Sequence, residues 1–327
     1  MSLQKMLIGL ICLPVLFAQR GPSLTPGEIE PRAQAATKLR ALIEAAPILP
    51  LERTDLMVNL PEGQELGMVS WVTRDPKTGV TWVIQRGDKA DPVIAVDKDG
   101  RVLRSFGKGL FTIPHAIRLD PQGNVWTVDA ASSTVIKFSP EGEKPLQIDV
   151  GGQPETARSA FRGTTDITFA PKGRVFTSDG YANARILEYT MDGKKVREWG
   201  TLGTGPGQFH LPHSIVVDEN DILYVADREN GRIERFDLDG HFLGEIPNLG
   251  RTYSLKLGAE GTLWAGMAQL NEPIGGPGWV VKLDRKTGKI LGYVPVPDKA
   301  GLHSVEDAGN GQPMTVVSNK VVWFKSH

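Results

Sequence analysis

From Asp55 to the end of the chain, hydrophobic residues fall in short runs separated by turns rich in Gly, Pro, Asp and Asn. Examples are the runs 80–84, 125–128 and 223–226. Short alternating or apolar runs bounded by such turn residues are typical of β-strands. The pattern therefore predicts a long series of strands over residues 55–327.

The segments before Asp55 have a different pattern. Residues 1–18 hold one Lys followed by a thirteen-residue apolar run, which is typical of a secretory signal peptide and shorter than the ~20 residues of a membrane span. An uncleaved membrane anchor is the alternative. Between Pro26 and Pro50, apolar residues recur at helical spacing. We therefore expect a signal peptide over 1–18, a helical extension over 19–54 and a β domain over 55–327. The mature protein would be secreted or periplasmic, without a membrane span.

One motif recurs six times in the strand region. His115–Trp126 and Tyr253–Trp264 align without a gap, with a turn glycine and a tryptophan in matching places. The other four copies begin at Ser70, Thr165, His213 and His303; we call the six first residues the head residues. Each copy predicts a hairpin, then a third strand, a tight turn and a fourth strand. Four strands repeated six times at about 40–50 residues predict an all-β, six-bladed β-propeller with four-stranded blades.

The repeat also predicts how the ring is packed and closed. The aromatic residues that end the hairpins are expected to pack between blades: Trp82, Trp126, Phe176, Tyr224 and Trp264. The last copy ends near Phe324 without room for a fourth strand. We therefore expect residues 56–58 to supply that strand and close the ring.

The net charge of the chain argues against one class of function, nucleic-acid binding. The 37 Lys and Arg residues against 38 Asp and Glu give a formal charge of 37 − 38 = −1. Binding to nucleic-acid backbone needs a basic surface, so nucleic-acid partners are disfavoured. We expect a monomer that acts on a small molecule or a peptide C-terminus.

Three of the six head residues are histidines, and they stand in alternate copies. His115, His213 and His303 are separated by 213 − 115 = 98 and 303 − 213 = 90 residues, each about two repeats. Alternate blades of a six-membered ring lie about 120° apart, so these side chains would meet on the central axis. Three imidazoles with an open fourth direction form the ligand set of a catalytic zinc site. The alternative is that each histidine caps a strand or forms a hydrogen bond in the core. His210, His241 and His327 lie off this register and are expected to be solvated.

A second set of residues follows the second strand of three copies. Arg86 and Arg228 occupy equivalent positions, and Tyr181 lies one residue further along its copy. Because antiparallel pairing brings the end of strand two beside the start of strand one, these side chains should emerge near the histidines. Arginine can anchor a carboxylate or a carbonyl oxygen, and a phenol can exchange a proton. Surface ion pairs, such as Arg228 with Glu229 or Asp227, are the alternative.

At the level of longer motifs, the chain resembles the peptidyl-α-hydroxyglycine α-amidating lyases, within the NHL-repeat propellers. The resemblance covers roughly residues 56–324. It rests on the segments Gln85–Asp88, Gly109–His115, Ser178–Arg185, Pro206–His213 and Ala226–Ile233.

This resemblance implies a zinc-dependent carbon–nitrogen lyase. His115, His213 and His303 would hold zinc, Arg86 and Tyr181 would act at the reacting centre, and Arg228 would help to bind substrate. The implied reaction cleaves the C–N bond of a carbinolamide, a peptide ending in α-hydroxyglycine, to give an amide and glyoxylate.

The resemblance also implies a structural calcium ion, held partly by the backbone carbonyls of Val72 and Ile117. Here the chain departs from the family pattern. Gly301 and Ser304 replace a methionine and the acidic calcium ligand, so calcium would need Glu306 or Asp307 as its carboxylate.

Two other functions remain open. The first is a metal-dependent propeller hydrolase or lyase with another substrate, such as a lactone or an ester. The second is a non-catalytic secreted NHL-repeat protein that binds through its rim.

Overall fold

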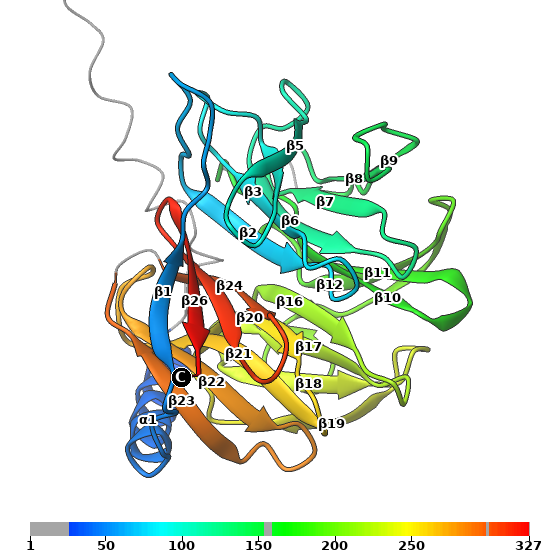
Figure 1. Ribbon diagram of the computed structural model, residues 1–327. Helices are drawn as coiled ribbons and strands as arrows, with labels where there is room; N and C mark the ends of the chain where they lie inside the picture. The colour runs from blue at the N-terminus through cyan, green and yellow to red at the C-terminus, as the bar shows by residue number, and fades with distance from the viewer. Residues whose placement is uncertain (1–25, 154–158, 299–300, 327) are drawn as a thin grey trace, which may run out of the picture.

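The computed structural model describes residues 26–153, 159–298 and 301–326, and it confirms the six-bladed β-propeller. Each blade is an antiparallel sheet of four strands, with its first strand innermost (Figure 1). Blade 1 consists of β2 (Val69–Arg74), β3 (Thr81–Gln85), β4 (Val93–Val96) and β5 (Val102–Phe106). Blade 2 consists of β6 (Pro114–Leu119), β7 (Val125–Asp129), β8 (Thr134–Phe138) and β9 (Leu146–Asp149). Blade 3 consists of β10 (Thr164–Ala170), β11 (Arg174–Asp179), β12 (Arg185–Thr190) and β13 (Lys195–Trp199).

The second half repeats the same order. Blade 4 consists of β16 (Pro212–Val217), β17 (Leu223–Asp227), β18 (Arg232–Phe236) and β19 (Phe242–Ile246). Blade 5 consists of β20 (Arg251–Leu257), β21 (Thr262–Ala268), β22 (Gly278–Asp284) and β23 (Ile290–Val296). Blade 6 consists of β24 (Gly301–Asp307), β25 (Pro313–Val317), β26 (Lys320–Lys325) and β1 (Glu52–Leu56). A short parallel pair, β14 (Thr201–Leu202) and β15 (Gln208–Phe209), joins blades 3 and 4.

An N-terminal strand closes the ring, as Figure 1 shows where β1 lies beside β26. The closing strand is β1, Glu52–Leu56, rather than the predicted residues 56–58, and Leu56 pairs with Val321. The prediction was wrong in position because it searched for an apolar run. The fourth strand of a blade lies at the outer edge, where no apolar face has to be buried, and three of the five residues of β1 are exposed.

The core lies between blades rather than inside one layer. Separate clusters of buried apolar residues join blades 1 to 3, blades 3 and 4, blades 4 and 5, blades 5 and 6, and blades 6 and 1. The five predicted aromatic residues are all buried, each at most 4% exposed. Each blade therefore depends on its neighbours, as the repeat pattern requires.

The predicted tight turn between the third and fourth strands contains a glycine in blade 1. In blade 1, the Gly100 amide donates to the Asp97 carbonyl at 3.1 Å, and Gly100 has φ of +79°. A Cβ atom at this position would lie 1.5 Å from the Met57 carbonyl oxygen. Glycine is needed here both for the backbone angle and for the close approach of the neighbouring chain.

The N-terminal helix α1 (Pro26–Glu44) packs against blades 4 and 5. Ala36, Leu39 and Ile43 are buried, at helical spacing, and the last two join the cluster between these blades. No helix among the described residues is long and apolar enough to cross a membrane. The predicted signal peptide lies outside the described residues.

Candidate metal centre

A β-bulge reorients the head residue of the inner strand. The pairing of strands one and two shifts by one residue at Ser70, His115, Thr165, His213 and Tyr253, and a longer shift spans His303. An unpaired bulge residue can turn its side chain away from the sheet face, and bulges often lie beside functional sites. Here the bulges allow the histidines of alternate blades to turn toward the hub.

The three histidines meet at the hub. Each offers one nitrogen, and these three atoms all lie within 4.8 Å of one another. The ring centroids are 4.5 Å apart for His115 and His303, and 5.0 Å apart for each of the other two pairs. All three side chains are buried. The alternate spacing in the sequence therefore corresponds to a single cluster in space.

A ring of hydrogen bonds sets the orientation of each imidazole. In each histidine, Nδ1 lies within hydrogen-bond distance of a backbone carbonyl oxygen. The partners are the carbonyls of Thr165 for His115 (2.6 Å), Tyr253 for His213 (2.6 Å) and Ser70 for His303 (2.8 Å). A carbonyl oxygen can only accept, so Nδ1 carries the proton and Nε2 keeps its lone pair. Hydroxyls of the intervening blades form the matching bonds, namely Ser70 to the Pro114 carbonyl (3.0 Å), Thr165 to the Pro212 carbonyl (2.8 Å) and Ser254 to the Leu302 carbonyl (3.2 Å).

The electrostatics keep the imidazoles neutral. Burial, together with the charges of neighbouring His and Arg groups, holds the pKa values of His115 and His213 well below the usual range. Burial and the nearby arginines lower the pKa of His303 to about 3. His303 Nε2 is buried and has no hydrogen-bond partner among the described residues. Three neutral imidazoles with converging Nε2 atoms, one of them unpaired, fit a metal ion that prefers nitrogen ligands.

Tyr181 lies directly beside this cluster. It follows β11, and its hydroxyl lies 2.8 Å from His115 Nε2 and 3.1 Å from His213 Nε2. Burial raises the pKa of Tyr181 to about 12, although the positive charges of Arg228 and Arg86 act in the opposite direction. The phenol therefore keeps its proton at neutral pH in this structure.

Arg86 follows β3 and presents an unpaired donor to the same site. Its Nε donates to the Pro114 carbonyl at 2.9 Å, and its guanidinium lies 5.3 Å from the centre of the Phe161 ring. Its Nη2 is buried without a hydrogen-bond partner among the described residues. A buried, unsatisfied guanidinium nitrogen is costly. This donor is therefore suited to an anionic group of a ligand.

Arg228, which follows β17, is fully buried beside Tyr253. Its Nε donates to Glu229 at 2.9 Å. The ion pair that the sequence offered as the surface alternative thus exists, but it lies in the interior next to the histidines. Arg251 of β20 and Arg32 of α1 also contact the Glu229 carboxylate. Burial alone would raise the pKa of Glu229, but the three arginines lower it to about 2.

The contact from α1 leads to a testable prediction. Arg32 Nη1 donates to Glu229 Oε2 at 2.9 Å, and both side chains are mostly buried. We expect Arg32→Ala to lower the free energy of unfolding by about 1–3 kcal/mol, because a buried carboxylate loses a charged partner. Arg40→Ala removes an exposed arginine from the same helix. This control should change the free energy of unfolding by less than about 0.5 kcal/mol. Urea unfolding of both variants measures the difference, and equal effects would show that the contact has no stabilising role.

Comparisons with known proteins agree with the propeller fold. A family model described as "6-bladed beta-propeller" matches residues 155–274. The chain is 40% identical over 166 residues to peptidylglycine alpha-amidating monooxygenase of Rattus norvegicus, covering 48% of this chain and 17% of that protein. It is 36% identical over 149 residues to peptidyl-alpha-hydroxyglycine alpha-amidating lyase 1 of Drosophila melanogaster, covering 42% and 27%. The chain is related in sequence to the α-amidating lyases.

The matches to these relatives cover only part of each protein. The chain spans less than a third of the length of either of these curated relatives. A solved virginiamycin B lyase from Staphylococcus aureus matches over 85% of this chain and 100% of its own, with a TM-score of 0.60 and 16% identity. At that identity the match shows the propeller fold alone. The predicted resemblance to the α-amidating lyases is thus confirmed at the level of sequence.

Residues that the sequence did not identify also lie around the histidine cluster. Phe161 packs between Arg86 and Tyr181, and Met68 Sδ lies 3.8 Å from Arg86 Nη1. Phe161 belongs to a loop outside the repeat, so no pattern identifies it. Asp129 and Asp227 anchor the chain leading into the histidine strands by accepting backbone N–H groups. Each lies fourteen residues after a head histidine, a regularity that could have revealed both.

The off-register histidines differ from one another. His241 is exposed and pairs with Asp237, as expected. His210 is 4% exposed, and its Nδ1 lies 3.4 Å from Arg32 Nη2. The prediction that His210 is solvated was wrong because α1, distant in sequence, packs over it. His327 lies outside the described residues.

The residues around the expected calcium carbonyls do not fit calcium. The Val72 carbonyl accepts the Ser304 hydroxyl at 3.2 Å, and Ile117 lies within the β6–β7 pairing. Calcium requires six to eight oxygen ligands, usually including carboxylates. Glu306 instead binds Lys256 at 2.6 Å, and Asp307 accepts the Gly309 amide in its own turn. Neither replaces the missing acidic ligand.

Proposed function

We propose that this propeller is a zinc-dependent lyase that cleaves the C–N bond of a carbinolamide, giving an amide and glyoxylate. The observation that supports this proposal most is the convergence of three neutral imidazoles, one with an unpaired Nε2, beside buried Arg228, half-buried Arg86 and a phenol. The sequence similarity to α-amidating lyases supports the same reaction class.

His115, His213 and His303 would hold the zinc ion through Nε2, since each Nδ1 is committed to a backbone carbonyl. Zinc at this position would supply Lewis-acid polarisation of a substrate oxygen and so lower its pKa. The Nδ1 hydrogen bonds would keep the three rings oriented before and after binding.

The remaining chemistry belongs to side chains of this chain. The ionised form of Tyr181 takes the proton of the carbinol hydroxyl, the carbon–oxygen double bond of glyoxylate forms, and the C–N bond breaks. The bonding electron pair leaves with nitrogen, which takes that proton from Tyr181 to complete the amide and leaves Tyr181 ionised again. Arg86 stabilises the negative charge that develops on the substrate, and Arg228 helps to bind it.

The site favours a small, anionic end of a substrate. Arg228 is fully buried, and half-buried Arg86 has its Nη2 atom in the interior, so their charges act in a medium of low polarity, where they bind an anion more strongly than at a surface. This environment suits the carboxylate of a C-terminal α-hydroxyglycine. From the predicted leader, we further propose that the protein acts outside the cytoplasm, as a monomer.

The proposal is tested with the purified chain and an N-acyl-α-hydroxyglycine. We expect about one zinc per chain by elemental analysis, and release of amide and glyoxylate in a 1:1 ratio. Zinc binding without glyoxylate release would reject the carbinolamide reaction and favour another substrate, such as a lactone or an ester. A chain without stoichiometric zinc and without turnover would favour a non-catalytic binding protein.

A further inference from the structure

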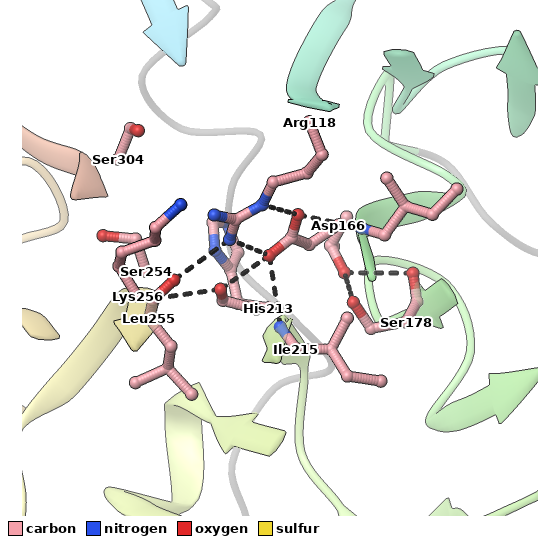
Figure 2. A network of polar contacts seen from close by, with 12 residues as sticks. Arg118, Asp166, Ser178, His213, Ile215, Ser254, Leu255, Lys256 and Ser304 are labelled. Carbon is pink, nitrogen blue, oxygen red and sulfur yellow. Dashed lines mark hydrogen bonds and ion pairs between the residues drawn. The ribbon is translucent and has the colours of Figure 1, made fainter. Parts of the chain in front are cut away.

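Next to the histidine cluster, the hub contains a buried ion pair (Figure 2). Arg118 of β6 donates from Nε to Asp166 Oδ1 at 3.0 Å and from Nη2 to Asp166 Oδ2 at 2.7 Å. The Arg118 and Asp166 side chains are 8% and 0% exposed. Two parallel hydrogen bonds between a guanidinium and a carboxylate form the most directional ion pair available to a protein.

The position of the guanidinium follows from the blades that it joins. Arg118 belongs to blade 2, and its Nη2 also donates to the Leu255 carbonyl of blade 5 at 3.0 Å. Blades 2 and 5 are opposite each other in a six-membered ring, so this side chain must cross the central axis. Leu255 lies two residues after its head residue, as do Val72 and Ile117. The guanidinium therefore lies on the axis, at the level of the two carbonyls expected to bind calcium.

The Asp166 carboxylate is saturated by other donors. Oδ2 accepts the Ser214 hydroxyl at 2.7 Å and the Ile215 amide at 3.2 Å, and Oδ1 accepts the Ile167 amide at 2.8 Å. The Leu255 amide in turn donates to the Ser214 hydroxyl at 3.0 Å. These bonds join blades 2, 3, 4 and 5 through one carboxylate, as Figure 2 shows.

A second ion pair joins the remaining blades. Lys256 Nζ of blade 5 lies 2.6 Å from Glu306 Oε1 of blade 6. The Thr73 hydroxyl of blade 1 donates to Glu306 Oε2 at 2.9 Å. With the Arg118 network, side chains at the hub therefore connect all six blades through ion pairs and hydrogen bonds.

We propose that the Arg118–Asp166 ion pair replaces a structural divalent cation in the hub, so that this propeller folds and remains stable without calcium. The guanidinium supplies positive charge at the axis and donates to a carbonyl at the level that calcium would use. It would also repel a second cation at this level. Ser304 stands in place of the acidic residue that calcium would need, and its hydroxyl donates to the Val72 carbonyl.

Calcium titration of the wild-type chain tests the proposal directly. The chain is treated with a chelator, reloaded with zinc alone and then titrated with calcium chloride. We expect no bound calcium by elemental analysis and a melting temperature that calcium changes by less than about 1 °C, because a ligand stabilises only the state that it binds. Stoichiometric calcium, or a rise of several degrees at submillimolar calcium, would overturn the proposal.

Variants test the role of the ion pair. Arg118→Met should lower the melting temperature by roughly 6–12 °C, because it leaves a buried carboxylate without its cation. Arg101→Met removes an exposed arginine that pairs with Asp97. This control should change the melting temperature by less than about 2 °C. If Arg118→Met does not fold, the double variant Arg118→Met/Asp166→Leu removes both charges and should lose much less stability than either single change. A melting temperature of Arg118→Met equal to that of the wild type would reject the structural role.

Discussion

Alanine at His213 is expected to reduce bound zinc from about one ion per chain to less than about a tenth of that. His213 supplies one of three imidazoles whose nitrogens lie within 4.8 Å of one another, and no other histidine among the described residues belongs to the group. Two remaining ligands should not hold the ion during purification. The rate of glyoxylate release should fall at least about a hundredfold with the zinc content. Elemental analysis and the glyoxylate assay on the same preparation measure both effects.

The matched control is His241→Ala. His241 is exposed and pairs with Asp237 at the surface, so this variant should keep both zinc and activity. Circular dichroism checks that His213→Ala is folded, since it also loses the hydrogen bond to the Tyr253 carbonyl. A folded His213→Ala chain with full zinc would disprove the metal site and leave the propeller without its proposed chemistry.

The repeat made most of the fold predictable. Turn glycines such as Gly100 and aromatic positions such as Trp126 are favoured by the same local geometry in most copies, so they recur and can be counted. The three histidines were found for the same reason. Once six copies close into a ring, equivalent residues of alternate blades must face one another. A periodic sequence can therefore report contacts between residues that are almost 100 positions apart.

Contacts that occur once in the ring left no such signal. Arg118 reaches Leu255 across 137 residues, and Arg32 reaches Glu229 across 197. Neither pair has an equivalent in another copy. Each contact depends on which groups lie within reach of a long arginine side chain once the blades have packed. The bulges at the head residues are also invisible in the sequence, because the alternation of side chains continues on both sides of them. For these reasons Asp166 and Glu229 were not identified as part of the hub.

Replacing Tyr181 by phenylalanine should lower kcat by about 10²–10⁴-fold while the zinc content stays the same. The change removes only the hydroxyl that lies 2.8 Å from His115 Nε2 and 3.1 Å from His213 Nε2, whereas the three imidazoles remain. Loss of zinc together with activity would instead assign the phenol a role in holding the metal site. Tyr224→Phe is the matched control, because Tyr224 is also buried and bonds to Asp218 away from the hub.

The pH dependence of kcat distinguishes a role of Tyr181 in proton transfer from a purely structural role of its side chain. Burial raises the pKa of Tyr181 to about 12, so the ionised form that accepts a proton is scarce at pH 7 and increases as the pH rises. In the wild type, kcat should therefore rise with pH by about tenfold per unit below the pKa in the working site. Tyr181→Phe should lose this slope as well as most of the rate. Arg228 lowers the same pKa, so Arg228→Met should move the rise to higher pH. A profile of unchanged shape in Tyr181→Phe would show that another group accepts the proton.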